Sequence, residues 1–223
     1  MAKHAHGLVI AVDGTAASGK GTLAKHLARA YDLAHLDTGS LYRGVSIRLL
    51  RQGIRGDIDP DIAALEASRI EKSDLNDPAL RAEDTSAMAS VIASLPEVRA
   101  ALMAYQRQFA HTPPNHHKGA ILDGRDIGTI ILPNADFKFF CDASPEIRAE
   151  RRYKELLSAG ETAIYADILV AIKERDHRDM TRQVAPLRPA EDAIHIDTGQ
   201  FTVEDMVARA MQIIASSDHF PPV

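Results

Sequence analysis

A run of nine residues near the N-terminus has the residue types and the spacing of a loop that binds phosphate. Glycine at both ends lets the backbone curl so that successive N–H groups point at phosphate oxygens, and a helix beginning there adds partial positive charge. The lysine can then reach the β and γ phosphates of a nucleoside triphosphate. A glycine-rich turn with a surface lysine is the alternative, but it leaves the flanking strand and helix as a coincidence. The run consists of Gly14, Thr15, Ala16, Ala17, Ser18, Gly19, Lys20, Gly21 and Thr22.

The hydroxyl group that usually follows the lysine of such a loop is displaced by one residue. Gly21 follows Lys20 directly, and the hydroxyl comes at Thr22. In the common form of the loop, the serine or threonine after the lysine binds Mg²⁺. We therefore expect Thr22 to contribute to a metal site either directly or through a water molecule.

Residues suited to phosphate chemistry also follow two other predicted strands. Thr38, Tyr42 and Arg43 come after the second strand, whereas Asp123 ends the third strand and Arg125 follows it. Because ligands bind at the carboxyl ends of the strands in a doubly wound sheet, we expect these side chains to face bound phosphates. Asp123 suits holding Mg²⁺ or its waters, and Arg125 can clamp a second phosphate. For any one of them a structural salt bridge is the simpler interpretation, but their coincidence at three strand ends favours phosphate chemistry.

Three arginines in the C-terminal third of the chain are spaced like residues on one helix face. Arg175, Arg178 and Arg182 lie three and four residues apart, which predicts guanidinium groups along one side of a helix. Glu174 and neighbouring acidic residues could pair with them on a solvated helix, and for this segment alone that is the simpler interpretation. Beside a phosphate-binding loop, arginines on a lid can instead stabilise the charge of a transferring phosphoryl group.

The elements that must position these residues alternate between short apolar runs and helical patterns. This alternation is typical of a parallel sheet covered by helices. A helix is expected directly after the loop, because Leu23, Leu27 and Tyr31 recur at helical spacing. The predicted strands are 8–12, 34–37, 120–123, 137–142 and 193–197.

Capping sequences mark the starts of three further helices. Ser94 and Glu97 form a capping-box pattern around an early proline. Ser144 precedes another proline, and Thr202 with Asp205 repeats the capping pattern. We expect a helix to begin at each of these places.

Two segments interrupt the alternation of strands and helices. Residues 53–85 carry many charges, few aromatic residues and two turn signals, so we expect a mainly helical insertion covering 53–110. Residues 159–189 are dense in charge, and we expect a segment at 159–185 to project from the sheet. Both segments belong to a single domain spanning 1–223, because the chain is well short of two ordinary domains.

Composition excludes several classes of protein. With 45% hydrophobic and 26% charged residues, the 223-residue chain has an ordinary globular composition. A net charge of -5 argues against binding to a nucleic-acid backbone. Cys141, the only cysteine, excludes an intrachain disulfide and a multi-cysteine zinc site, and His116 with His117 in a proline-rich loop favours a solvated loop over a metal site. With neither a membrane-spanning apolar run nor a signal peptide, we expect a cytoplasmic protein. Few aromatic residues and no tryptophan argue against a large exposed apolar patch, so we expect a monomer.

Taken together, the motifs resemble those of the cytidylate kinases, a branch of the nucleoside monophosphate kinase family. The loop with Gly-Lys-Gly-Thr is shared by the whole family. The strings Asp-Gly-Arg-Asp-Ile-Gly-Thr at 123–129 and Lys-Glu-Arg-Asp-His-Arg-Asp at 173–179 are more particular to the cytidylate branch. The matching segments, which span nearly the whole chain, are 14–22, 37–43, Ser90 with 95–99, 123–129 and 172–187.

This resemblance implies a fold and a reaction. The fold would be α/β, a P-loop NTPase-type five-stranded parallel sheet covered by helices. Residues 53–110 would form an insertion that binds the nucleoside monophosphate, and 159–185 would form a short lid. The reaction would transfer the γ-phosphoryl group of ATP to CMP or dCMP with the help of Mg²⁺. These small molecules would be the partners, with no nucleic acid and no membrane.

The resemblance also implies roles for single residues. The loop would bind ATP, with Lys20 at its phosphates, and Arg43 and Arg125 match the clamp on the acceptor phosphate. Arg175 and Arg182 match lid arginines near the transferring group. A carboxylate beside an arginine can pair with the exocyclic amine and the acceptor atoms of cytosine. Uracil offers a carbonyl in place of that amine. Matching the positions that recognise the cytosine side are Thr38, Ser90, Arg99 and Asp126, and Asp179 matches the carboxylate that contacts the acceptor sugar.

The chain departs from this family in two places. Residues 53–85 lack the alternating strand pattern that forms a small sheet in many members, which bears on lid closure and on discrimination between CMP and UMP. The loop has Thr15, Ala16 and Ala17 where a proline and a further glycine are frequent. Alanine suits that position on the condition that its φ is negative.

Three alternatives share part of these features. A small-metabolite kinase such as shikimate or gluconate kinase shares the fold, but it normally has serine or threonine directly after the lysine. A kinase of AMP or UMP would share the chemistry and differ in base recognition. A GTP-dependent switch usually reads guanine with Asn-Lys-x-Asp, a string that this chain lacks.

Overall fold

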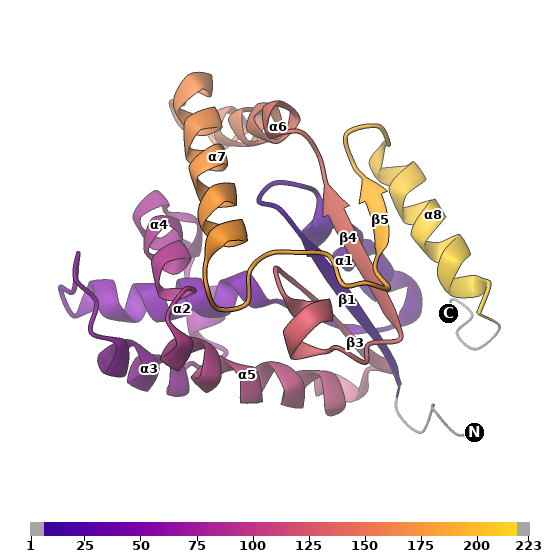
Figure 1. The fold of residues 1–223 in the computed structure, drawn as a ribbon, viewed down its shortest axis with the longest axis horizontal. Helices are drawn as coiled ribbons and strands as arrows, with labels where there is room; N and C mark the ends of the chain where they lie inside the picture. Colours follow the sequence, from indigo (N-terminus) through magenta and orange to yellow (C-terminus); the bar gives the residue numbers. More distant parts are fainter. Residues whose placement is uncertain (1–6, 218–223) are drawn as a thin grey trace.

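All five predicted strands are present in the computed structural model, which describes residues 7–217, apart from the side chains of residues 81 and 83. They are β1 (Leu8–Gly14), β2 (Ala34–Asp37), β3 (Gly119–Gly124), β4 (Phe137–Asp142) and β5 (Ile194–Asp197). Neighbouring strands run parallel in the order β2-β3-β1-β4-β5, and Figure 1 shows helices on both sides of the sheet. The prediction of an α/β fold with a five-stranded parallel sheet is therefore confirmed.

Eight longer helices and four short ones connect the strands within the described residues. The longer helices are α1 (Lys20–Tyr31), α2 (Thr38–Arg51), α3 (Pro60–Ser68), α4 (Glu83–Ile92), α5 (Pro96–His111), α6 (Pro145–Ser158), α7 (Tyr165–Thr181) and α8 (Val203–Ala215). The short ones are η1 (Asp74–Asn76), η2 (Pro78–Arg81), η3 (Pro114–His116) and η4 (Ile127–Ile131), of which η4 is a π-helix.

Two apolar clusters, one on each face of the sheet, hold the layers together. On one face, Leu23 of α1 and Met206 of α8 pack in a cluster with Phe139 of β4. On the other face, Leu41 of α2 and Leu102 of α5 belong to a second cluster that includes apolar residues of β1, β2 and β3. Burying a side chain of this size stabilises the fold by about 1.5–3 kcal/mol. This packing fixes the strands, and with them the residues at the strand ends.

The carboxyl ends of β1, β2 and β3 meet at one edge of the sheet. In the parallel register, Asp13 lies beside Gly124 and Asp37 lies beside Asp123. The loop that follows β1, the start of α2 and the turn that follows β3 therefore share this edge. As expected for a strand covered on both faces, every residue of β3 is buried.

Residues 53–110 contain only helices and turns, without a strand anywhere in this stretch. The loop between α4 and α5 is short, and it corrects one prediction. Ser94 does not form a capping box, because its hydroxyl donates to the carbonyl oxygen of Val91 at 2.6 Å and Leu95 is the N-cap of α5. The capping predictions at Ser144 and Thr202 are confirmed, since their hydroxyl oxygens accept from backbone N–H groups at 3.3 and 3.2 Å.

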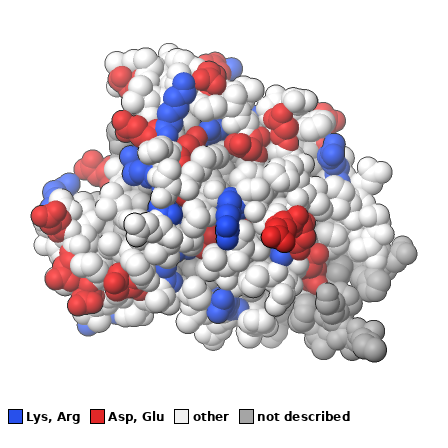
Figure 2. All heavy atoms as spheres, viewed as in Figure 1, with Lys and Arg blue, Asp and Glu red and all other residues white. Residues whose placement is uncertain are grey.

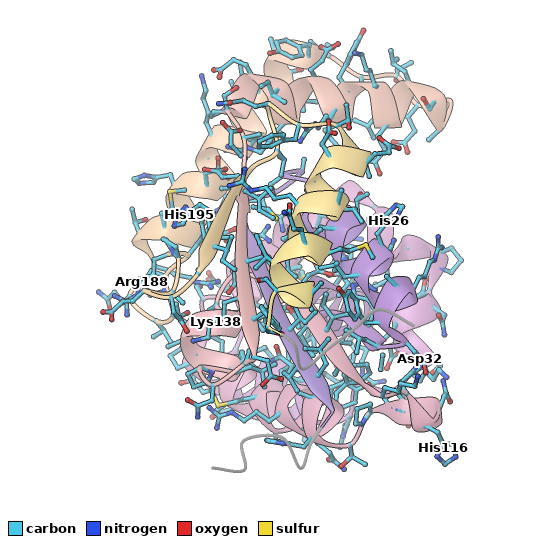
Figure 3. The ribbon with its side chains drawn as sticks, turned by 90° about the vertical axis from the view of Figure 1, so that its right-hand side faces the viewer. His26, Asp32, His116, Lys138, Arg188 and His195 are labelled. Carbon is cyan, nitrogen blue, oxygen red and sulfur yellow. The ribbon has the colours of Figure 1, made fainter. Side chains whose placement is uncertain are left out.

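Helices α6 and α7 lie beyond the carboxyl ends of β1 and β4, at the top of Figure 1, and α7 runs down toward α4. The charged side chains on the face drawn in Figure 2 are mixed, with Lys and Arg in small separate groups rather than one broad basic surface. Figure 3 shows His116 pointing outward from the fold, while His117 Nδ1 lies 2.9 Å from Oδ1 of Asp32.

Within residues 7–217, no single helix is long and apolar enough to cross a membrane. One bent pair, Asp84–Ile92 with Pro96–His116, meets the criteria of length and composition only when its two parts are taken together, and they meet at 96°.

Candidate active site

The loop between β1 and α1 wraps its backbone around the point where a phosphate would sit. Gly14 has no room for a side chain, since a Cβ there would lie 2.0 Å from the carbonyl oxygen of Cys141. Gly19 has a φ of 87°, and α1 begins at the next residue, Lys20. Nζ of Lys20 reaches back to the carbonyl oxygen of Thr15 at 3.3 Å. The lysine thus closes the loop, and the helix N-terminus points into it.

Ala17 corrects the expectation for the middle of the loop. Its φ is 58°, in the left-handed region. Any residue with a Cβ is disfavoured there by roughly 1–2 kcal/mol, and glycine is not. The condition of a negative φ is therefore not met, and the loop keeps its curled shape with a strained alanine.

A cavity of about 510 Å³ opens at the carboxyl edge of the sheet, between the loop, α2, α4, α5, α6 and α7. Nine Lys and Arg but only five Asp and Glu line it. The local excess of positive charge is notable in a chain whose net charge is -5. Such a cavity suits ligands that carry several negative charges. The basic residues are Lys20, Lys25, Arg43, Arg99, Arg125, Arg151, Arg152, Arg175 and Arg182.

One part of the cavity is built around Asp126, which directly follows Arg125. Asp126 accepts from Arg99, and Arg182 Nη2 lies 3.9 Å from its other carboxylate oxygen. Both arginines also donate to the carbonyl oxygen of Ala93, at 3.1 and 3.4 Å. All three charged side chains are buried or nearly so. Tyr42 supports this arrangement, because the Arg99 guanidinium lies 5.9 Å from the centre of its ring.

Three buried polar atoms in the cavity have no hydrogen-bond partner within the part of the chain that the structure describes. They are Oγ of Ser90, Nε of Arg175 and Nη2 of Arg182. Buried donors without an acceptor are costly in a folded protein, at about 1–3 kcal/mol each and more for charged groups. An anionic ligand with several oxygen acceptors would satisfy them.

The carboxylate of Asp179 joins two of the arginines. Its Oδ2 accepts from Nε of Arg125 at 2.8 Å and lies 4.0 Å from Nε of Arg175. Although burial alone would raise it, these guanidinium groups hold the pKa of Asp179 below its ordinary value. For Arg175 the balance is opposite, since burial and the charge of Arg125 lower its pKa to about 10. The carboxylate therefore remains ionised and holds the arginines together.

Lys20 lies in the same field of positive charge. Burial, followed by the charge of Arg125, lowers the pKa of Lys20 to about 8. The nearby carboxylates of Asp123 and Asp37 act in the opposite direction. A ligand phosphate at this position would favour the charged lysine.

Asp123 and Thr22 line the loop side of the cavity with a carboxylate and a hydroxyl side chain. Oδ2 of Asp123 lies 2.7 Å from Nε2 of His35, and a Cβ at Gly21 would lie 3.8 Å from Oδ1. Carboxylate and hydroxyl oxygens suit Mg²⁺, which usually keeps several waters and takes substrate phosphates as ligands. The donor set therefore fits Mg²⁺. No cluster of three or more His, Cys, Asp or Glu side chains in residues 7–217 could hold a metal ion without such help.

The sequence matches one family of nucleotide kinases over nearly its full length. The model of that family, described as cytidylate kinase, matches residues 10–216. The chain belongs to the cytidylate kinase family. Members of this family are ATP-dependent nucleoside monophosphate kinases, and this chain is one of them.

Relatives in this kinase family are similar over the whole domain. A cytidylate kinase from Paramagnetospirillum magneticum is 49% identical over 211 residues, covering 93% of this chain and 98% of the relative. A cytidylate kinase from Bradyrhizobium sp. (strain ORS 278) is 48% identical over 208 residues, covering 93% and 95%. Among solved structures, an uncharacterized protein from Eubacterium ventriosum shares the fold, with a TM-score of 0.54 at 17% identity, over 94% of this chain and 98% of that one.

The structure brings together most of the residues that the motifs of this kinase family singled out. Three members of the loop, Gly14, Thr15 and Ser18, are buried and do not line the cavity. The other predicted residues line it: Ala16, Ala17, Gly19, Lys20, Gly21, Thr22, Thr38, Tyr42, Arg43, Ser90, Arg99, Asp123, Arg125, Asp126, Arg175, Asp179 and Arg182.

The prediction that Arg178 shares a helix face with Arg175 and Arg182 is wrong. Arg178 is exposed and lies 3.9 Å from the carboxylate of Glu174, whereas the other two line the cavity. Arg182 is the C-cap of α7, and its N–H still donates to the carbonyl oxygen of Arg178 at 3.1 Å. Helical spacing therefore places Arg175 and Arg182, two turns apart, on the side of α7 that faces the cavity, and only Arg178 departs from the prediction.

Two arginines of α6 also line the cavity and were missed in the sequence. Arg151 is held in place by Thr198, to which it donates at 3.1 Å and 2.6 Å, and Arg152 lies 2.9 Å from Glu155. Both stand in a run of alternating charges that is typical of a solvated helix. Only the position of α6 beside the phosphate loop reveals them.

Proposed function

We propose that this chain transfers the γ-phosphoryl group of ATP to the phosphate of CMP or dCMP, giving ADP and CDP or dCDP. The observation that carries the proposal is the strongly cationic cavity, which has a phosphate-binding loop on one side and the Arg99–Asp126 pair on another. Two anionic nucleotides would meet within it. Family membership supports the same reaction.

The loop side of the cavity is the proposed ATP site. Backbone N–H groups at the start of α1 and the Lys20 ammonium would bind the β and γ phosphates. Mg²⁺, held by Asp123 and Thr22 directly or through water, would neutralise phosphate charge there. Because Lys20 now donates to a carbonyl oxygen of its own loop, it only has to turn outward to reach a phosphate.

The cytosine base is proposed to be recognised by Asp126, Arg99, Ser90 and Thr38. Asp126 can accept from the exocyclic amine of cytosine, while Arg99 donates to its ring acceptors. Ser90 has a buried hydroxyl oxygen without a partner among the described residues, so it is free to bond the base. Uracil offers a carbonyl where cytosine offers the amine, and two acceptors would then face each other.

Five other charged residues are proposed to hold the acceptor phosphate, the sugar and the transferring group. Arg43 and Arg125 would clamp the acceptor phosphate, since a guanidinium fork matches phosphate oxygens. Asp179 would contact the sugar, and Arg175, with Arg182, would stabilise the charge on the transferring phosphoryl group. The unpartnered Nε of Arg175 is consistent with this role.

The proposed mechanism is direct in-line transfer between the two nucleotides. The acceptor phosphate is already an anionic nucleophile, so no general base is required. Catalysis then consists of positioning and of cationic stabilisation. The insertion at 53–110 and the lid at 159–185 would close over the substrates and exclude water, which suppresses hydrolysis of ATP. We propose that a monomer does this in the cytoplasm, where both nucleotides occur.

An acceptor panel tests the proposal. Purified protein is mixed with Mg-ATP and one of CMP, dCMP, UMP, AMP, GMP or shikimate, and ADP release is followed by a coupled assay. We expect strong turnover with CMP and dCMP and weak turnover with the others. Strong turnover with another acceptor instead would keep the phosphoryl transfer and refute the roles of Ser90, Arg99 and Asp126.

A further inference from the structure

Asp13 is a buried carboxylate that the proposed mechanism does not use. It is the last residue of β1 before Gly14, where the phosphate loop begins, and its side chain is almost fully buried. The two carboxylate oxygens accept from two successive backbone N–H groups, Ile127 N to Oδ1 at 2.8 Å and Gly128 N to Oδ2 at 2.7 Å. The central strand is thereby tied to the turn that follows β3.

That turn carries Asp126. It is the π-helix η4, for which Asp126 is the N-cap. The first N–H groups of a helix have no acceptor within the helix. The carbonyl oxygen of Asp126 accepts from Ile130 and Ile131, at 2.9 and 3.2 Å. Asp13 accepts from the N–H groups of Ile127 and Gly128 at the start of the same turn, next to Asp126, and so holds that end of the turn against β1.

Keeping a carboxylate at this position is costly for the fold. Burial raises the pKa of Asp13 to about 7, although the two N–H groups act against this. The negative charge of Asp126 raises the pKa of Asp13 further, and the positive charge of Arg125 lowers it. On the neighbouring strand β4, Cys141 pairs with Gly14, and the aliphatic chain of Lys138 (Figure 3) approaches Gly128. An apolar residue on the strand would avoid this cost but would leave the N–H groups of Ile127 and Gly128 without their acceptor. The carboxylate is therefore retained at the cost of its own burial because it holds the turn.

We propose that Asp13 is a positioning residue for acceptor recognition. By accepting from the N–H groups of Ile127 and Gly128, it fixes the turn that orients Asp126 toward the acceptor base. This inference rests on the proposed function. The acceptor-base site and the phosphate loop are then connected through adjacent residues, because Asp13 holds the turn with Asp126 and Gly14 begins the phosphate loop. Asp13 itself touches neither substrate.

Asp13→Asn tests this with little change in shape. A carboxylate accepts with both oxygens, whereas an amide accepts with one and turns its NH₂ group toward the second N–H. We expect the KM for CMP to rise about tenfold and the preference for CMP over UMP to fall, because the turn with Asp126 loosens. The dissociation constant of ATP, measured by calorimetry without acceptor, should stay within about twofold, since no ATP contact changes.

Two further variants separate positioning from loss of stability. Met206→Ala opens the core under α8, far from the turn, and should destabilise the fold. It should leave the KM for CMP and the dissociation constant of ATP unchanged. Gly128→Ala keeps the carboxylate but places a Cβ 3.4 Å from Oδ2 of Asp13 and 3.2 Å from Cδ of Lys138, so these side chains or the turn must give by a few tenths of an ångström. We expect Gly128→Ala to raise the KM for CMP in the same direction, and it serves as the test if Asp13→Asn does not fold.

The outcomes are distinguishable. A raised KM for CMP with unchanged ATP binding, in Asp13→Asn or Gly128→Ala but not in Met206→Ala, supports the positioning role. If the wild-type protein phosphorylates CMP but the two variants lose CMP and ATP binding equally, or change neither, the role of Asp13 is overturned and the proposed function stands. Failure of the wild-type protein to phosphorylate CMP overturns the proposed function, and this inference with it.

Discussion

Nε of Arg125, at the end of β3, donates to Oδ2 of Asp179 in α7 at 2.8 Å. The pair is largely buried and connects the sheet with the proposed lid. Because Arg175 also faces Asp179, one carboxylate balances two guanidinium groups at the centre of the cavity. Substrate phosphates entering there would compete for the same arginines. The ion pair is thus placed to couple substrate binding to the position of α7.

Asp179→Asn should destabilise the protein, because two buried guanidinium groups lose their common counter-charge. We expect the free energy of unfolding to fall by about 2 kcal/mol, measured by urea denaturation. Glu174→Gln is the matched control on the same helix. It removes an exposed ion pair with Arg178 and should change the stability by less than about 0.5 kcal/mol. Equal effects of the two substitutions would show that the buried pair does not anchor the lid.

Lys20 predicts a proton uptake when ATP binds. Its pKa in the folded protein is lowered to about 8, mainly by burial, and the phosphates of ATP would raise it again. Near pH 9 the free protein therefore holds a largely neutral lysine, and binding of ATP should take up close to one proton. Calorimetry in buffers of different ionisation enthalpy measures this number. Lys20→Met should abolish the uptake, and Lys154→Met, on the exposed face of α6, should not.

The lowered pKa of Lys20 also makes the free energy of unfolding depend on pH. Between about pH 8 and 10.5 the folded protein binds fewer protons at Lys20 than the unfolded chain does, so the contribution of Lys20 to the free energy of unfolding rises with pH. Lys20→Met should flatten this rise.

Lys20→Ala should lower kcat at least about a hundredfold, as does removal of one transition-state donor in other enzymes. Near-wild-type turnover would refute the assignment of Lys20 to the γ phosphate.

Ala17→Gly should stabilise the protein. The substitution relieves a residue whose φ is 58°, and the gain is partly offset by the greater freedom of glycine in the unfolded chain. We expect Tm to rise by roughly 2–3 °C, corresponding to about 1 kcal/mol. Ala16→Gly is the control, since Ala16 is not among the residues of positive φ and should lose stability. A lower Tm for Ala17→Gly would mean that its methyl group packs better than its backbone is strained.

Asp126→Asn should impair the acceptor site selectively. It removes the negative charge between Arg99 and Arg182, so we expect the KM for CMP to rise at least about tenfold while the dissociation constant of ATP changes little. Asp205→Asn, in α8 and remote from the cavity, should leave both constants unchanged. Equal losses for CMP and ATP in Asp126→Asn would contradict a role in base recognition.

The strands and the phosphate loop were predictable because their signals are local. An apolar run followed by a glycine-rich loop and a helical pattern allows few alternatives, and β2 and β4 have the predicted bounds. Ser94 shows the limit of such signals. Its capping pattern is intact in the sequence, but the end of α4 lies close enough for its hydroxyl to bond Val91 instead.

The site was predictable where motifs place residues at strand ends, and not where tertiary packing decides. Arg178 and Arg182 have equal claims by spacing, but Arg182 lines the cavity whereas Arg178 is exposed beside Glu174. Arg151 looks like a surface residue until the sheet order places α6 beside the loop. The partner of Asp13 is 114 residues away in the sequence, so no local pattern could reveal it.

The central claim is that the cavity passes a phosphoryl group from one nucleotide to another. Phosphorus NMR of a mixture of wild-type protein, Mg-ATP and CMP follows every phosphate species at once. The account predicts that the signals of ADP and CDP grow at equal rates, with no inorganic phosphate beyond the slow background. Growth of inorganic phosphate with ADP, and without CDP, would contradict it, because the cavity would then hydrolyse ATP rather than transfer its phosphoryl group.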